Sequence, residues 1–101
     1  MYKIFRTTSF KKDYKKLSLS DKNILKKVVT ILANGEILDE KYKDHPLIGN
    51  YLECRECHLK PDLLLIYRID NNILELALTR VGSHSKLFWL APQLGDYEIT
   101  F

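Results

Sequence analysis

Apolar residues near the N-terminus repeat with the spacing of an amphipathic helix. Phe10, Tyr14 and Leu17 recur at intervals of four and three residues, and lysines occupy most positions between them. Such a stripe predicts a helix that buries one face and exposes the other. We expect Thr8 or Ser9 to cap its N-terminus, because a short hydroxyl side chain can accept a hydrogen bond from an unpaired helical amide.

A short strand is expected before this helix and a longer helix after it. Residues 2–7 alternate polar and bulky side chains, which favours a strand. Ser20 is the expected N-cap of the second helix, and Asn34–Gly35 is its expected end. The apolar stripe of this helix consists of Ile24, Val28, Ile31 and Leu32.

Three strands are expected in the second half of the chain. Residues 51–59, 63–69 and 73–81 have strand-like patterns, and turn sequences at 60–62 and 70–72 separate them. Two helices followed by such a meander predict an α+β fold in the order β-α-α-β-β-β. Both helices should pack on one face of a small antiparallel sheet.

Other segments show no regular period. Residues 36–50 predict a loop, and a loop of this length in a small domain is more often functional than not. Residues 82–85 should lead away from the last strand. A proline and a glycine interrupt residues 87–101, and residues 97–101 are expected either to add an edge strand or to cover the core.

The composition predicts one folded domain over residues 1–101. With 46% hydrophobic and 29% charged residues, the 101-residue chain is too apolar for disorder and too short for two domains. No apolar run approaches the roughly 20 residues of a transmembrane helix, and the N-terminus does not resemble a signal peptide. We therefore expect a cytoplasmic protein whose two cysteines stay reduced.

Positive charge is concentrated at the start of the chain. The net charge is +3, but residues 1–30 contain nine Lys or Arg and only two Asp. This asymmetry favours a surface that meets a polyanion or an acidic protein segment, although a solvated lysine-rich helix face would give the same pattern. The lysines expected to contact RNA are Lys11, Lys12, Lys15 and Lys16.

Cys54 and Cys57 form a C-x-x-C-H sequence with His58, the pattern of covalent haem attachment. Haem is not expected, because the sole methionine is Met1 and no export signal is recognisable. Residues three apart on a strand point to opposite faces, so the two thiols should diverge and pack separately. Structural zinc would need a second ligand pair at comparable spacing, which the sequence lacks.

The three histidines lie in loops or at the ends of predicted strands, where functional sites are common. His45 is in the long loop, His58 ends one strand and His84 follows the last one. Together with Asp62 they can supply acid–base chemistry near neutral pH, or they can bind a metal, and their spacing does not decide between the two. The other candidate members of this site are Arg55, Glu56 and Arg80.

Three segments together resemble a known family. Residues 42–47, 55–67 and 80–88 are similar, in order and spacing, to the YafQ branch of the RelE-type toxins of bacterial toxin–antitoxin systems. The resemblance implies a ribosome-dependent mRNA endonuclease that uses no metal and is enclosed by a cognate antitoxin. Family members commonly end near Phe88, so residues 89–101 are an extension with no inherited role. The active-site residues that the resemblance implies are His45, His58, Asp62, His84 and Phe88, with Glu56 and Arg80 beside them.

A metal-free RNA nuclease needs a base for the 2′-OH, an acid for the leaving 5′-oxygen and cations for the phosphate. We expect His84 to be the acid, and Asp62 or His58 to be the base. Arg80 and His45 are expected to stabilise the phosphate.

The remaining predictions concern RNA contacts and partners. Phe88 is expected to stack on an unpaired base, or else to belong to the core, and Glu56 is expected near the RNA. Expected partners are mRNA, the ribosome through its RNA, and an antitoxin, with DNA contacted only through the antitoxin complex. The alternatives are a non-catalytic RNA-binding domain and a small zinc-binding protein.

Overall fold

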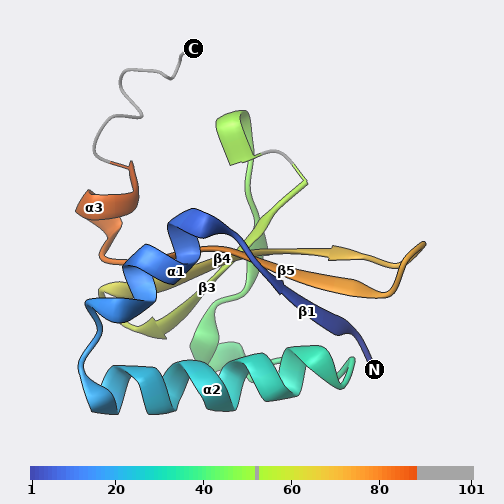
Figure 1. Ribbon diagram of the computed structural model, residues 1–101, viewed down its shortest axis with the longest axis horizontal. Helices are drawn as coiled ribbons and strands as arrows, with labels where there is room; N and C mark the ends of the chain where they lie inside the picture. The colour runs from blue at the N-terminus through green and yellow to red at the C-terminus, as the bar shows by residue number, and fades with distance from the viewer. Residues whose placement is uncertain (52, 89–101) are drawn as a thin grey trace.

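The computed structural model describes residues 1–51 and 53–88 (Figure 1). Its helices and strands are β1 (Lys3–Arg6), α1 (Thr8–Lys15), α2 (Leu19–Ala33), β2 (His45–Pro46), β3 (Arg55–Lys60), β4 (Leu63–Asp70), β5 (Glu75–Gly82) and α3 (His84–Phe88). Two short 3-10 turns, η1 (Glu40–Tyr42) and η2 (Gly49–Tyr51), lie between α2 and β3.

The strands form one sheet in the order β1-β5-β4-β3-β2. The predicted α+β fold and the β3–β5 meander are confirmed, but the sheet is mixed rather than purely antiparallel, because β1 runs parallel to β5. A parallel pair needs a long crossover, which all the elements between β1 and β5 provide. β1 is an edge strand, and all four of its residues are exposed.

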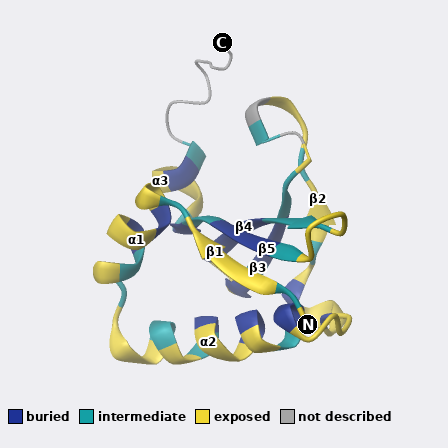
Figure 2. Ribbon diagram, turned by 45° about the vertical axis from the view of Figure 1, so that its right-hand side comes forward, coloured by how far each residue is buried: buried dark blue, intermediate teal, exposed yellow. Residues whose placement is uncertain are grey.

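Helices cover both faces of the sheet. α1 and α2 pack on one face, named here the helix face, and form the main core with Leu65 and Tyr67 of β4. α3 packs on the opposite face, the α3 face, where Leu87 joins Leu64 and Ile66. In Figure 1, α2 lies below the sheet and α3 above it. Side chains alternate between the two faces along β4, and both faces are covered (Figure 2), so the first five residues of the strand, 63–67, are all buried and apolar or aromatic.

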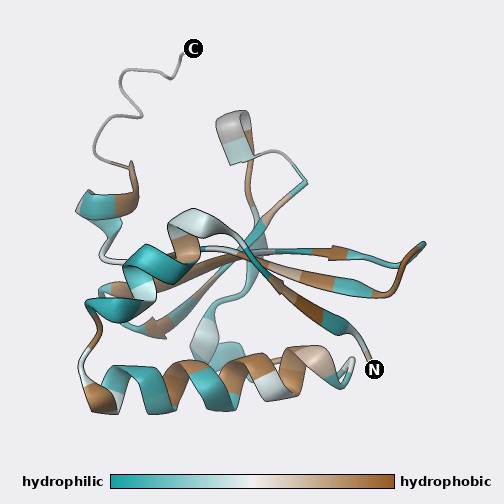
Figure 3. Cartoon of the chain, viewed as in Figure 1, coloured by the Kyte–Doolittle hydropathy of each residue, from teal (hydrophilic) through white to brown (hydrophobic). Residues whose placement is uncertain are grey.

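Both long helices begin before the predicted residue. The Thr7 hydroxyl accepts a hydrogen bond from the Phe10 amide (3.0 Å), and the Ser18 hydroxyl accepts one from the Asp21 amide (3.1 Å). The caps predicted at Thr8 or Ser9 and at Ser20 are therefore wrong, because these residues lie inside the helices. Hydrophobic and hydrophilic residues alternate along α2 (Figure 3), as expected of a helix with one buried face.

Part of the predicted loop at residues 36–50 is ordered by the sheet, because β2 pairs antiparallel with the start of β3. β3 begins at Arg55, not at residue 51, since η2 precedes it. The helix α3 begins at His84, where only an exit from the last strand was predicted. Residues 97–101, for which an edge strand or core cover was predicted, lie outside the described residues. In the described part of the chain, no helix is long and apolar enough to cross a bilayer.

Candidate active site

β2 and β3 place two histidines around one buried carboxylate. His45 lies opposite Glu56 in the β2–β3 pair, with 3.0 Å between His45 Nε2 and Glu56 Oε1. His58 follows two residues later on the same face of β3, and its Nε2 is 3.6 Å from the same oxygen. We name these three residues the histidine cluster. The Glu56 side chain is only 7% exposed and lies between the two imidazoles, while its expected place near the RNA stays a prediction.

Asp44 anchors the backbone that carries His45. Its carboxylate accepts hydrogen bonds from Arg55 Nε (3.2 Å) and from the Tyr67 hydroxyl (2.6 Å). Hydrogen bonding to Asp44 raises the pKa of Arg55, while burial, helped by Asp44, raises the pKa of Tyr67. Arg55, a candidate member of the site from the sequence, is therefore engaged in holding the segment that leads to His45.

α3 carries the second part of the candidate site. Its first residue is His84, whose backbone amide donates a hydrogen bond to Asp62 Oδ1 (3.2 Å) in the turn between β3 and β4. The Phe88 ring lies 5.0 Å from the His84 ring and meets the Tyr51 ring edge-on at 5.7 Å. Asp62 thus fixes the start of α3, and Phe88 is half-buried beside His84.

Both parts of the site lie on the α3 face. His58 pairs with Leu64, and Leu64 pairs with Gly82, so these residues form one row across the sheet. Neighbouring strands are about 4.8 Å apart, which puts the His58 backbone about 10 Å from that of Gly82, two residues before His84. An apolar patch of Leu64, Ile66 and Leu87 lies on this face. The structure therefore brings the sequence-predicted histidines to one face, while their catalytic roles stay a prediction.

Arg80 of β5 also belongs to the α3 face, since it pairs with Ile66, but its guanidinium is bound by α1. Its Nε donates to Asp13 Oδ2 (2.7 Å), and its Nη2 donates to Asp13 Oδ1 (3.2 Å). Hydrogen bonding to Asp13 raises the pKa of Arg80. The Arg80 side chain keeps 25% of its surface exposed, so it is a fixed cation with part of its surface open.

Asp13 is a buried residue that was not predicted as part of the site. It is 5% exposed, and its Oδ2 also accepts a hydrogen bond from the Val81 amide (3.1 Å). β1 ends at Arg6, opposite Leu78, so no β1 residue is available to accept a hydrogen bond from the Val81 amide of β5. The Asp13 carboxylate accepts this hydrogen bond instead. The signal was available, because Asp13 follows Phe10 by three residues and precedes Leu17 by four, on the apolar stripe of α1.

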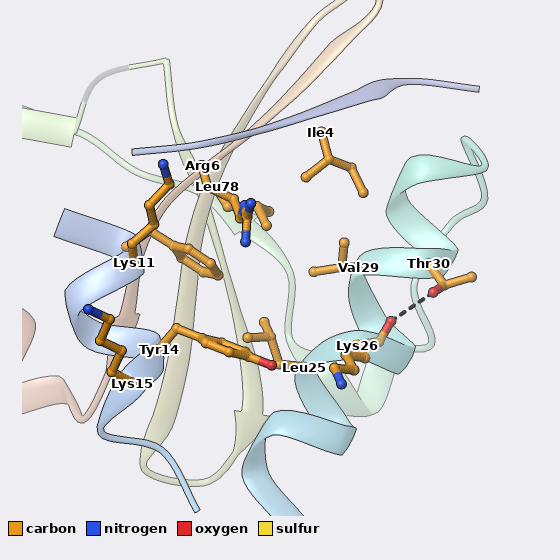
Figure 4. A pocket seen from close by; sticks show the side chains of 11 residues that line it. Ile4, Arg6, Lys11, Tyr14, Lys15, Leu25, Lys26, Val29, Thr30 and Leu78 are labelled. Atoms are coloured by element: carbon orange, nitrogen blue, oxygen red, sulfur yellow. Dashed lines mark hydrogen bonds between the residues drawn. The ribbon is translucent and has the colours of Figure 1, made fainter. Parts of the chain in front are cut away.

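Most α1 lysines lie away from the histidines. Lys11 and Lys15 border a groove between α1, α2 and β1, on the helix face (Figure 4). A second hollow lies beside Asp62, and Lys16 lines it. Lys12 is exposed and lines neither of these two hollows. Of the four lysines expected to contact RNA, the structure brings only Lys16 near a candidate catalytic residue.

The two cysteines diverge as predicted. Cys57 is completely buried in the main core on the helix face, whereas Cys54 packs against the apolar patch of the α3 face. Both thiols are free. The sequence-based prediction of two separately packed thiols is confirmed.

The Cys57 thiol should resist alkylation in the folded protein. Burial raises the pKa of Cys57 to about 12 from its ordinary value of 9.0, and the thiolate is the reactive form. Because the folded pKa lies above the unfolded one, the stability linked to this proton is complete below pH 9 and is lost as the pH rises towards 12. In a Cys54→Ala variant, iodoacetamide labelling should be far slower in the folded protein than in urea, and equal rates would contradict this.

The histidine cluster could hold a metal ion. One ligand atom from each of His45, Glu56 and His58 lies within 4.8 Å of the others. His45 Nδ1 is 3.0 Å from the carbonyl oxygen of Pro46, and an Nδ1–H that donates there leaves the Nε2 lone pair for a metal. Two imidazoles and a carboxylate are ligands that suit Zn²⁺ or Cu²⁺.

This fold occurs in small bacterial toxins, including the toxin of a toxin–antitoxin complex. The family described as "Bacterial toxin of type II toxin-antitoxin system, YafQ" matches residues 2–89. The chain therefore belongs to the YafQ toxin family, as its sequence resemblance predicted.

Three relatives illustrate the match. The mRNA interferase toxin YafQ of Escherichia coli K12 is 41% identical over 69 residues, which cover 67% of this chain and 73% of that protein. A copper-bound mutant toxin from Helicobacter pylori has a TM-score of 0.79 at 43% identity and covers 87% of this chain and 100% of its own. A chain of the E. coli DinJ–YafQ toxin–antitoxin complex has a TM-score of 0.75 at 36% identity, with 86% and 97% covered.

Proposed function

We propose that this YafQ-family toxin cleaves mRNA by acid–base catalysis on the α3 face of its sheet. The observation that carries the proposal is the placement of the histidine cluster and His84 on one face: the His58 backbone is about 10 Å from that of Gly82, and His84 follows Gly82 by two residues. The E. coli relative, an mRNA interferase, supports RNA as the substrate.

His58 is our candidate general base. The base takes the proton of the RNA 2′-OH, and the 2′-oxygen then attacks the adjacent phosphorus. The buried Glu56 carboxylate, 3.6 Å from His58 Nε2, would stabilise the imidazolium that forms. Asp62, the other candidate base, accepts the His84 amide, and we assign it the role of positioning α3.

His84 is our candidate general acid. It is exposed at the start of α3, where it can give a proton to the 5′-oxygen as the P–O5′ bond breaks. The fixed guanidinium of Arg80 would supply positive charge for the phosphorane oxygens, and the exposed His45 would contact the phosphate beside it. The products are then a 2′,3′-cyclic phosphate, or the 3′-phosphate from its hydrolysis, and a 5′-OH.

The chemistry of the fragment ends tests this proposal. The protein would be incubated with an mRNA, either free or on programmed ribosomes, in the presence of EDTA. Fragments with 5′-OH ends, which polynucleotide kinase labels without prior phosphatase treatment, are expected. Fragments with 5′-phosphate ends would contradict attack by the 2′-OH, and comparison of the two RNA samples measures the dependence on ribosomes.

An acidic antitoxin and the ribosome are the partners that we propose for the basic surface. The groove in Figure 4 combines apolar side chains such as Ile4 and Leu78 with Lys11 and Lys15 at its border, so an amphipathic acidic segment fits it. The DinJ–YafQ complex supports an antitoxin partner. The affinity for the antitoxin should fall as the salt concentration rises, because salt screens the attraction between charges. Action on ribosomes would place the protein in the cytoplasm.

Binding of Cu²⁺ or Zn²⁺ by the histidine cluster is a second proposed property. The proximity of three ligand atoms and the copper-bound H. pylori toxin support it. A metal bound to the histidine cluster would engage the His58 imidazole that we assign as the general base, so the metal should inhibit cleavage rather than promote it.

Calorimetric titration with Zn²⁺ should show one ion bound per chain, and EDTA should restore cleavage in a metal-inhibited sample. His45→Ala removes one of three ligands and should weaken binding at least tenfold, since even outer contacts of a metal site are worth about 10–100-fold. Cys54→Ala is the matched control and should bind Zn²⁺ normally. Unchanged affinity in His45→Ala would show that other residues hold the metal.

A further inference from the structure

A basic groove runs along the free edge of β3, next to the histidine cluster. β2 pairs only with Arg55 and Glu56, so in the described part of the chain the second half of β3 has no strand on its outer side. A groove of about 600 Å³ occupies this position, bordered by α2, η1 and the turn after β3. We name it the β3-edge groove.

The charge of this groove is entirely positive. Its lining includes Lys27 from α2, Lys41 and Lys43 from the η1 region, and Lys60 from the end of β3, with no acidic side chain. Among the described residues, only Lys60 of these four has a carboxylate partner, with its Nζ 2.8 Å from Asp21 Oδ1. Three ammonium groups therefore remain available to a polyanion.

The groove offers charge rather than an aromatic platform. Its one aromatic residue, Tyr42, is 7% exposed, and the Lys41 ammonium lies over the Tyr42 ring, 5.2 Å from its centroid. Grooves that follow the backbone of a single strand use cationic side chains, whereas exposed aromatic rings add base stacking. The ligand suited to this groove is thus a chain of phosphates, held without regard to base identity.

His58 connects the groove to the candidate active site. Its side chain lines the groove and also lies 3.6 Å from Glu56 in the histidine cluster. We propose that the β3-edge groove binds the backbone of the single-stranded RNA next to the scissile phosphate. This inference rests on the proposed function. An acidic protein segment would match the charge as well, but only a substrate strand needs to continue from His58.

The test removes two groove charges and compares the result with a matched loss elsewhere. The groove variant carries Lys27→Gln and Lys43→Gln, and the control carries Lys3→Gln and Lys26→Gln. All four lysines are exposed, and none has an ion-pair partner among the described residues. The two variants therefore have the same net charge, and neither loses a buried contact.

Binding is measured by fluorescence anisotropy with a short single-stranded RNA that carries 2′-O-methyl riboses and so cannot be cleaved. For single strands, log K falls with log salt by about 0.7 per phosphate contact. The groove variant should lower this slope by about 1.4, relative to wild type and control, between about 50 and 200 mM salt. With cleavable RNA, its KM should rise while kcat stays within twofold of wild type.

The possible failures are distinguishable. A groove variant with the same salt slope and KM as the control overturns the inference, even if both proteins cleave mRNA. If wild type cleaves RNA neither free nor on programmed ribosomes, but the slope still changes only in the groove variant, the proposed function fails while the groove remains an RNA site. If the groove variant loses affinity for a synthetic Asp- and Glu-rich peptide but not for RNA, the ligand is a protein segment and the inference is wrong.

Discussion

Replacing His84 with alanine should lower the rate of mRNA cleavage by about 10²–10⁴-fold, the usual contribution of a general acid. Without this imidazole, the 5′-oxygen must leave unprotonated. Affinity for RNA should change little, because the lysines of the β3-edge groove and the Phe88 ring are untouched. The measurement compares single-turnover cleavage with anisotropy on the 2′-O-methyl RNA, and regulated expression in a bacterium should show that growth arrest is lost.

Ser85→Ala is the matched control for this experiment. Ser85 is the exposed neighbour of His84 on α3, and its hydroxyl contacts only that of Ser83, at 3.5 Å, among the described residues. Cleavage by this variant should equal that of wild type. If His84→Ala also cleaves at the wild-type rate, the acid has been assigned wrongly, and His58→Ala becomes the next variant to measure.

Asp13→Ala should lower the free energy of unfolding by about 3 kcal/mol, the low end of the range for breaking a buried ion pair. The change leaves the Arg80 guanidinium and the Val81 amide without their shared acceptor. The low end applies because Arg80 keeps 25% of its side-chain surface exposed, so that water can hydrate its guanidinium once Asp13 is removed. Urea denaturation followed by circular dichroism measures the loss.

Two further variants separate charge from hydrogen bonding. Asp13→Asn keeps the size of the side chain and one carbonyl acceptor. Its free energy of unfolding should therefore lie between that of wild type and that of Asp13→Ala. Lys12→Ala changes an exposed neighbour on the same helix and should shift the free energy of unfolding by no more than about 0.5 kcal/mol. A value for Asp13→Ala as small as that of Lys12→Ala would refute a structural role for the Arg80 pair.

Local sequence patterns were sufficient for the helices and for the β3–β5 meander, since periodicity and turn residues act over a few positions. They predicted the strand β1 but not its parallel pairing, because its partner β5 lies near the other end of the described chain. Helix starts were predicted too late because several hydroxyl residues follow one another there. The cap is the first of them whose oxygen meets a free amide, as Thr7 and Ser18 show.

The candidate site was predictable only in part, because its members come together through pairing between segments distant in the sequence. The sequence and its family resemblance selected the histidines, but their arrangement around Glu56 depends on β2, a two-residue strand without a pattern of its own. Asp13 was overlooked because it was counted as one charge in a basic helix. The groove was not predicted because its lysines come from separate elements, and three of the four lie beyond the basic residues 1–30.

The exposed edge strand β1 affects how the isolated protein behaves in solution. In the described part of the chain no strand pairs with its outer side, and Ile4 and Phe5 on it are 50% and 52% exposed. Such an edge can join that of a second molecule. Lys3 and Arg6 flank the two apolar residues, so two approaching edges repel each other. Because salt screens this repulsion, the colloidal stability of concentrated samples should decrease as ionic strength rises.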